Sequence, residues 1–395
     1  MNILLLYYTP FSQEDSFYWF YKQLILWLNK NGNPSELYFC YLNKKEEEYI
    51  ENGLQLPDKH KFNSRKNVSA IVDFIGLNKI DVLFNFYLPV WIVGSFLLSI
   101  KKMCPNIKLI ELIHNCPNHT LQLKKYNLEN INSGYQANSI KEKIIKLFPK
   151  LYLSLLEKKV CQENRQAYKI HDAIVLLSPS YISEYLSLIG IRESNKVFAI
   201  PNPLAPKSFC NSNILVQDKE KEILFCGELR IEKSILTLLK VWKNIQNKVP
   251  DWKFIIVGDG IQMPQCKEVV KKWNIERVEF KGYVDSRPLI DRASVLCLSS
   301  VIEGLPTVFL EAMSMGVVPI GFNSFSAIYD MIDNWKNGVI VPAFNIDEYS
   351  KSLVKLMTED NLRMRIAEAA KIKVQQYDVD IVGKQWNELF NIISK

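Results

Sequence analysis

A loop near residue 300 combines residue types that could bind a phosphate. Glu303 lies in this loop with Gly304 and Pro306, between an apolar run at Val295–Leu298 and a helix expected to begin near Thr307. The first amide groups of a helix have no partners within it, so the amino end of a helix attracts anions. The stretch therefore predicts an anion-binding site.

The helix expected after this loop carries a polar stripe on an otherwise apolar surface. Thr307, Glu311 and Ser314 stand at positions i, i+4 and i+7, where side chains share one helix face. A buried carboxylate without a partner is costly. Glu311 therefore needs either a ligand with hydroxyl donors or a buried salt bridge.

Short apolar runs alternate with amphipathic segments of helix length, which indicates parallel sheets with helical crossovers. The first series comprises Ile3–Tyr8, Val82–Phe86, Lys108–Ile113, Ala173–Leu177 and Val197–Ile200. After three prolines within 201–206, the second comprises Glu222–Cys226, Lys253–Val257, Val278–Phe280, Val295–Leu298, Val317–Ile320 and Gly338–Val341. We predict an α/β fold of two Rossmann-like, doubly wound domains facing a central cleft, with ligands beyond the carboxyl ends of the strands.

The two glutamates also carry a family resemblance. Glu303 and Glu311, with seven residues between them and Gly304-Leu305-Pro306 after the first, resemble the E-x7-E signature of glycosyltransferase family 4, whose members are retaining GT-B enzymes. The resemblance is close over about 220–345. It implies that Glu311 holds the ribose hydroxyls of a donor nucleotide. It further implies that catalytic Glu303 and the loop residues Gly304, Leu305, Pro306 and Thr307 address the donor sugar and its phosphates.

A second segment, 225–233, is similar to the part of the family that neutralises the leaving diphosphate. The family usually has an arginine where this chain has Glu228, and a lysine five residues beyond it, where this chain has Lys233. Lys233 is therefore the implied catalytic cation, and Arg230 is a further candidate for the phosphates. The competing interpretation of Arg230 is a surface ion pair with Glu228 or Glu232.

Three further residues are implied by the resemblance. Tyr283 and Val284 fall in a segment similar to the one whose backbone meets the nucleobase. His114 follows the run Lys108–Ile113 and matches a histidine near the donor sugar, although a packing role is the alternative. Its neighbours Cys104, Cys116 and His119 fit no common zinc-finger spacing, so we expect no metal site.

The resemblance implies sugar transfer from a nucleotide-diphosphate donor to a glycan or lipid-linked acceptor, with retention of configuration, as in surface polysaccharide biosynthesis. We expect no metal and no cofactor besides this co-substrate, because a lysine and a helix dipole can neutralise the leaving diphosphate. Glu228 leaves open a non-catalytic GT-B scaffold or nucleotide-sugar-binding protein. Phosphorylases and epimerases of the same fold are less favoured.

The expected domains are 1–205, an N-terminal acceptor-binding domain, and 206–376, a C-terminal nucleotide-sugar-binding domain. The remaining segment, 377–395, is expected to form a helix that packs back on the N-terminal domain. Asp378-Val379-Asp380 superficially matches a metal-binding Asp-x-Asp motif, but its position at the start of this helix indicates a cap.

Lysines concentrate in one segment, because residues 121–160 contain eight lysines and three glutamates. Apolar and basic residues interleave over 141–160, as in a helix on an anionic membrane surface. The alternative is an ordinary surface helix whose apolar side faces the first-domain core. The lysines are not interleaved with aromatic platforms, so we expect no nucleic-acid partner.

The chain carries no apolar run of the roughly 18 to 20 residues that a membrane-spanning helix needs. Its apolar start, 1–8, lacks a basic leader and is expected to be a buried strand rather than a signal peptide. The eight cysteines are scattered and are expected to be reduced. We expect a cytoplasmic protein that is either soluble or peripheral on the inner face of the membrane.

Overall fold

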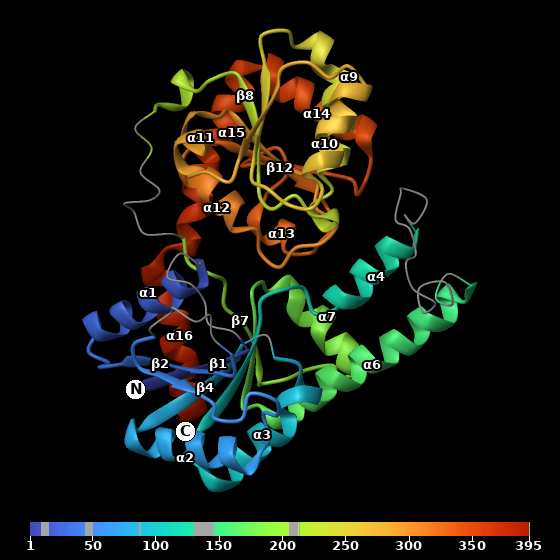
Figure 1. Ribbon diagram of the computed structural model, residues 1–395. Helices are drawn as coiled ribbons and strands as arrows, with labels where there is room; N and C mark the ends of the chain where they lie inside the picture. Colours follow the sequence, from blue (N-terminus) through green and yellow to red (C-terminus); the bar gives the residue numbers. More distant parts are fainter. Residues whose placement is uncertain are drawn as a thin grey trace. The chain divides into compact units, whose positions relative to one another are not determined.

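The structure is a computed structural model, shown in Figure 1, and it describes residues 1–8, 16–43, 50–86, 88–129, 145, 147–204, 212 and 214–394. The chain divides into two compact units. The first unit comprises Met1–Asn202 and Val379–Lys395, and the second unit comprises Pro203–Asp378. These limits lie within a few residues of the expected domain boundaries.

The first unit is built on a parallel sheet of seven strands in the order β3-β2-β1-β4-β5-β6-β7. Its strands are β1 (Asn2–Tyr7), β2 (Glu36–Tyr41), β3 (Gly53–Gln55), β4 (Ile80–Phe86), β5 (Lys108–Ile113), β6 (Ala173–Leu176) and β7 (Val197–Ala199). Its helices are α1 (Ser16–Lys30), α2 (Arg65–Leu77), α3 (Val90–Met103), α4 (His119–Glu129), α6 (Pro149–Ile170), α7 (Ser180–Ile189) and α16 (Val379–Ser394). Each face of the sheet has its own apolar core, because the strands are buried on both sides.

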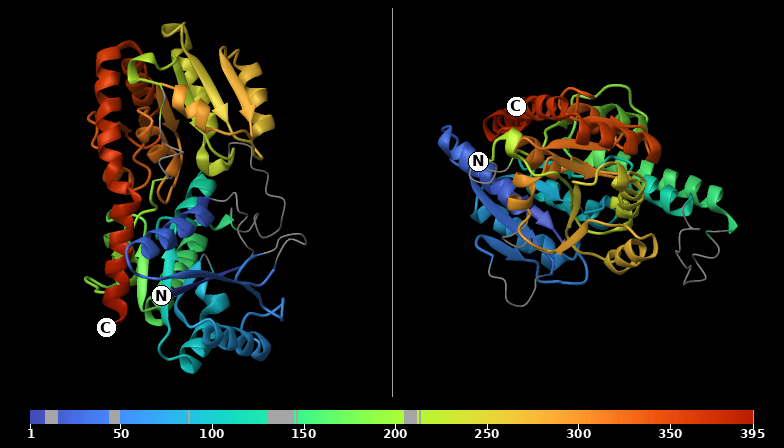
Figure 2. Two further views of the ribbon diagram at one scale, coloured as in Figure 1. Left: turned by 90° about the vertical axis from the view of Figure 1, so that its left-hand side faces the viewer. Right: turned by 90° about the horizontal axis from the view of Figure 1, so that it is seen from above.

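The last helix of the chain, α16, packs beside α1 on one face of this sheet (Figure 2). Trp386 is buried against Phe84 of β4, with ring centroids 5.3 Å apart. The indole nitrogen of Trp27 donates a hydrogen bond of 2.9 Å to a carboxylate oxygen of Asp380. In this structure, the second aspartate of the Asp-x-Asp segment therefore anchors α16 to α1.

The second unit is built on a parallel sheet of six strands in the order β10-β9-β8-β11-β12-β13. Its strands are β8 (Glu222–Cys226), β9 (Lys253–Val257), β10 (Val278–Gly282), β11 (Val295–Leu298), β12 (Val318–Phe322) and β13 (Val339–Val341). Its α-helices are α9 (Ile235–Ile245), α10 (Met263–Lys272), α11 (Arg287–Arg292), α12 (Thr307–Ser314), α13 (Ile328–Met331), α14 (Ile346–Thr358) and α15 (Asp360–Lys373). Short 3-10 turns η2 (Val216–Asp218), η3 (Ile231–Lys233), η4 (Gln246–Lys248) and η5 (Val374–Tyr377) complete it.

The predicted fold class, two doubly wound α/β domains with parallel sheets, is confirmed. Every expected strand is present, with limits shifted by no more than two residues. The sequence analysis missed two strands, β2 and β3, which form one edge of the first sheet. β3 has only three residues and none of them is fully buried, so it lacks the apolar run that indicates a buried parallel strand.

Both sheets reverse their strand order once. In the second unit, β8 to β10 extend to one side of β8, and β11 to β13 then extend to the other side. The loops that follow β8 and β11 therefore leave neighbouring strands in opposite directions. In doubly wound sheets this reversal point is where ligands bind.

Candidate functional site

The loops after β8 and β11 meet at the reversal point of the second sheet. The ammonium of Lys233 donates a hydrogen bond of 2.6 Å to a carboxylate oxygen of Glu303. Ser299 at the end of β11 holds the first loop in place, since its hydroxyl donates to the carbonyl oxygens of Lys233 and Ser234, each at 2.9 Å. The amide of Val301 donates to the carbonyl of Glu232 at 2.7 Å. Two catalytic candidates that lie 70 residues apart in sequence are thus in direct contact.

A third loop, after β9, supports the Lys233 loop from the other side. A methyl group added at Gly258 would lie 2.0 Å from the carbonyl oxygen of Gly227, and the φ of Gly258 is +122°. Only a glycine fits there without moving the backbone. The amide of Leu229 also donates to the carbonyl of Asp259 at 2.9 Å. The Gly-Asp-Gly segment, which resembles an ordinary turn in the sequence, is therefore the point where two loops cross.

The amino end of α12 lies directly after Glu303. Gly304, Leu305 and Pro306 are buried, and Thr307 is the first residue of the helix. Among the described residues, no side chain caps this end of α12. The helix dipole and the first amide groups therefore favour an anion beside Glu303 and Lys233.

Glu311 lies one turn into the same helix and is half-buried. Burial raises the pKa of its carboxyl above the usual value, and the nearby guanidinium of Arg287 lowers it in part. No described cation lies within ion-pair distance of Glu311, so the salt bridge that was the alternative interpretation is not formed in the part of the chain that the structure describes. Its carboxylate is available to hydroxyl donors of a ligand.

Arg230 forms the surface ion pair that was its competing interpretation. Its guanidinium lies 2.5 Å from a carboxylate oxygen of Glu228 and 3.6 Å from one of Glu232. The Arg230 side chain is about half exposed, so these pairs contribute little to stability. A phosphate could still compete for this guanidinium, and its role in the site stays a prediction.

The sequence analysis missed Arg287, the guanidinium whose charge acts on Glu311. Arg287 begins α11 and also pairs with Asp285 at 2.6 Å. An arginine followed by a proline in a turn resembles an ordinary helix start, so no sequence signal distinguished it. Tyr283 and Val284, just before this pair, are exposed and able to contact a ligand.

His114, the remaining candidate, belongs to the first unit and lies directly after β5. Its ring packs against Phe86 with centroids 4.5 Å apart, and its Nε2 lies 3.1 Å from the hydroxyl of Tyr21. Burial lowers the pKa of His114 to about 3, so the imidazole is neutral at physiological pH. It also lines a cavity of about 270 Å³ with Glu111 and His119.

A buried polar pair near this cavity was also missed. A carboxylate oxygen of Glu111 lies 3.0 Å from Nε2 of His171 and accepts a hydrogen bond of 2.6 Å from Asn85. Burial raises the pKa of Glu111 to about 8 and lowers that of His171 to about 4. Both groups are therefore neutral near pH 6. The residues considered for zinc do not gather into a metal-binding set within the described segments.

Comparisons with known proteins agree with this geometry. Residues 211–373, which contain Lys233, Glu303 and Glu311, match the family model described as glycosyl transferases group 1. This segment is therefore similar to a group 1 glycosyltransferase domain. Membership of glycosyltransferase family 4 in particular stays a prediction.

Two curated relatives are glycosyltransferases by name. The chain is 31% identical over 198 residues to an uncharacterised glycosyltransferase of Haemophilus influenzae. This aligned stretch covers 49% of this chain and 55% of the relative. It is 29% identical over 174 residues, 44% of this chain and 48% of the relative, to a Campylobacter jejuni protein. That protein is named as an alpha-1,4-N-acetyl-D-galactosaminyltransferase acting on a GalNAc-containing diNAcBac-PP-undecaprenol. The chain spans about half the length of these curated relatives.

The fold outside the matched segment is also shared with solved structures. HepE from Anabaena, solved in complex with UDP-glucose, superimposes with a TM-score of 0.72 and 14% identity, covering 99% of this chain and 100% of that chain. At this identity the similarity establishes the fold alone. No described helix combines the length and the apolar character that crossing a membrane requires.

Proposed function

We propose that the protein is a retaining glycosyltransferase that transfers a sugar from a nucleotide-diphosphate donor to a glycan or lipid-linked acceptor in surface polysaccharide biosynthesis. The observation that carries the proposal is the contact of Lys233 with Glu303 beside the uncapped amino end of α12, inside a segment similar to a group 1 glycosyltransferase domain. A cation and a helix dipole at one point suit the diphosphate of a nucleotide sugar.

Each residue has a distinct role in this proposal. Lys233 and the amides after Pro306 neutralise the leaving diphosphate, Glu311 accepts hydrogen bonds from the ribose hydroxyls, and Glu303 orients the donor sugar. The acceptor hydroxyl attacks on the face from which the diphosphate leaves, and the leaving phosphate helps to remove its proton. Neutral His114 donates to the donor sugar, and no metal takes part.

The relatives support the choice of substrates. The Campylobacter jejuni relative is named for an undecaprenol-linked glycan, and HepE was solved with UDP-glucose. A lipid-linked acceptor and a uridine diphosphate sugar are therefore the first substrates to test. A cytoplasmic enzyme peripheral to the membrane would meet both.

Ligand-induced thermal stabilisation tests the donor site. The protein is heated with a panel of nucleoside diphosphates in EDTA, with Glu311→Ala and Lys233→Ala as site variants and Glu268→Ala and Lys267→Ala as exposed controls. We expect a stabilising shift for one nucleotide that both site variants lose and both controls keep. If no nucleoside diphosphate in the panel raises the unfolding temperature, the proposal is refuted.

A second candidate is a non-catalytic GT-B scaffold or nucleotide-sugar-binding protein, which Glu228 favours because the family usually has an arginine there. Hydrolysis of the nucleotide sugar without acceptor separates the two. A transferase releases the nucleoside diphosphate slowly and Lys233→Ala abolishes this release, whereas a scaffold binds the donor and leaves it intact.

A further inference from the structure

The first half of α6 turns large apolar side chains to solvent. Leu147 and Phe148, just before the helix, and Leu151 and Leu155 within it are 57 to 72% exposed. Phe148, Leu151 and Leu155 are spaced by three and four residues, so they share one helix face. Single exposed leucines are ordinary, but a contiguous apolar strip marks a contact surface.

This exposure answers a question that the sequence left open. An ordinary surface helix would place these side chains in the core of the first unit. Instead, the buried residues of α6 are Val160 and Ala167, both in its second half and on the opposite face. The helix α6 lies beside α4, and both helices extend past the edge of the sheet (Figure 1). The apolar strip is therefore uncovered by the described residues of its own unit.

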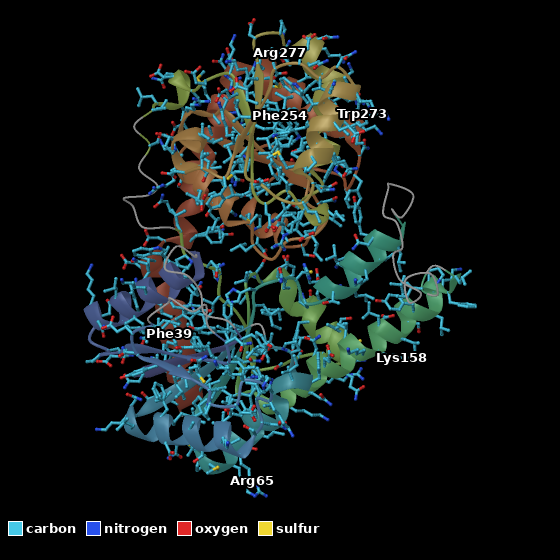
Figure 3. All side chains as sticks on the ribbon, in the orientation of Figure 1. Phe39, Arg65, Lys158, Phe254, Trp273 and Arg277 are labelled. Atoms are coloured by element: carbon cyan, nitrogen blue, oxygen red, sulfur yellow. The ribbon has the colours of Figure 1, made fainter. Side chains whose placement is uncertain are left out.

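Basic side chains border the strip. Lys150, Lys158 and Lys159 are exposed, and Lys158 extends from the outer side of α6 in Figure 3. The ammonium of Lys159 lies 5.4 Å from the ring centroid of Trp91, an exposed side chain of the neighbouring helix α3. Together, α4 and residues 147–170 contain seven lysines and arginines against three glutamates.

We propose that these residues form a membrane-binding face for an anionic lipid bilayer, consisting of Leu147, Phe148, Leu151 and Leu155 with Trp91 and the bordering lysines 150, 158 and 159. The apolar side chains enter the boundary between headgroups and acyl chains, and the lysines bind lipid phosphates. Trp91 suits the same boundary because its ring is amphipathic.

The charge of the face favours lipid over a second copy of this chain. A symmetric dimer through this surface would bring the same lysines against each other, which repels. An anionic bilayer complements both the apolar strip and the lysines. The inference rests on the proposed function only in that a lipid-linked acceptor would lie in the same bilayer.

Co-sedimentation with vesicles tests the face without any donor or acceptor. The full chain is mixed with phosphatidylcholine vesicles that do or do not contain phosphatidylglycerol, at low and high salt. The apolar variant carries Phe148→Ser, Leu151→Ser and Leu155→Ser, and the basic variant carries Lys150→Gln, Lys158→Gln and Lys159→Gln. Each variant has a matched control that replaces exposed residues elsewhere. The control for the apolar variant carries Leu26→Ser, Leu77→Ser and Ile372→Ser. The control for the basic variant carries Lys66→Gln, Lys267→Gln and Lys351→Gln.

We expect the unmodified chain to bind the anionic vesicles and salt to weaken this binding. The basic variant should lose about fivefold in partition coefficient for each lysine, and the apolar variant about tenfold for each side chain. Both controls should bind like the unmodified chain. Thermal unfolding of every variant checks the fold, and since the replaced side chains are exposed, we expect unchanged midpoints.

Three results would overturn the proposal: no binding of the unmodified chain to anionic vesicles, equal losses in the controls, or an apolar variant that binds normally. A dimer in light scattering that the apolar variant converts to a monomer would assign the face to self-association instead. Nucleotide binding is measured separately, so failure of the membrane proposal is distinguishable from failure of the proposed transferase.

Discussion

Glu303 holds Lys233 in the ligand-free protein, and this contact predicts an unusual effect of mutation. A diphosphate must compete with the carboxylate of Glu303 for the ammonium of Lys233, because the two groups are 2.6 Å apart. Replacing Glu303 by glutamine removes the competing charge and keeps the shape. We therefore expect Glu303→Gln to bind a nucleoside diphosphate more tightly than the unmodified protein, although it transfers sugar more slowly.

The structure bounds the size of this effect. The Lys233 side chain is 29% exposed and that of Glu303 10%, so the pair lies between a surface and a buried ion pair. Surface pairs contribute up to about 1 kcal/mol, and hydrogen bonds to charged groups about 1.5 to 3 kcal/mol. Taking about 1 kcal/mol as the net cost of breaking the contact, Glu303→Gln should bind about fivefold more tightly. Lys233→Met should instead bind at least about tenfold more weakly, because the cation is lost.

Isothermal titration with the nucleoside diphosphate alone, in EDTA, measures both effects without contributions from the donor sugar. Glu268→Gln, an exposed acid on α10, is the matched control and should leave the affinity unchanged. The reasoning fails if Glu303→Gln weakens nucleotide binding, or if it leaves the affinity as it was while Lys233→Met weakens it.

Three other predictions concern stability and pH. Gly258→Ala should destabilise the second unit by about 3 kcal/mol or more in urea unfolding, because of the backbone contact at 2.0 Å; Gly76→Ala, with open space around its Cβ, should be neutral or slightly stabilising. The pKa of Glu111 is about 8 in the folded state against an ordinary value of 4.5, so the folded protein holds an extra proton over this interval and the contribution of Glu111 to stability should fall as pH rises from about 4.5 to 8, by up to about 1.4 kcal/mol per unit. The lowered pKa of His171 opposes this fall below about pH 6.5, so the net fall should lie between about pH 6.5 and 8. Glu111→Gln should remove this dependence, and an unchanged slope would contradict the assignment. Arg287→Ala should raise the pKa of Glu311 further. When the pH is lowered, Glu311 should therefore become protonated, and nucleotide affinity should be lost, at a higher pH than in the unmodified protein. An unshifted pH profile of nucleotide affinity would show that the two groups are not coupled.

Local patterns in the sequence were sufficient for the two-domain architecture. Strands buried on both faces need continuous apolar runs, so β8 and β11 were predicted with their observed limits, whereas β3, with three residues that are not fully buried, was missed. Glu303 and Glu311 could be found because one strand, loop and helix carry both, and their spacing does not depend on the rest of the fold.

Other features were decided by the tertiary structure, because they depend on which distant segments meet. The contact of Lys233 with Glu303 exists because the strand order reverses between β8 and β11. Gly258 must be glycine because another loop crosses its backbone. The apolar residues of α6 predicted an amphipathic helix, but only the packing of its second half left the first half exposed. Sequence periodicity defines the face of a helix, whereas the neighbours that cover that face are set by chain topology.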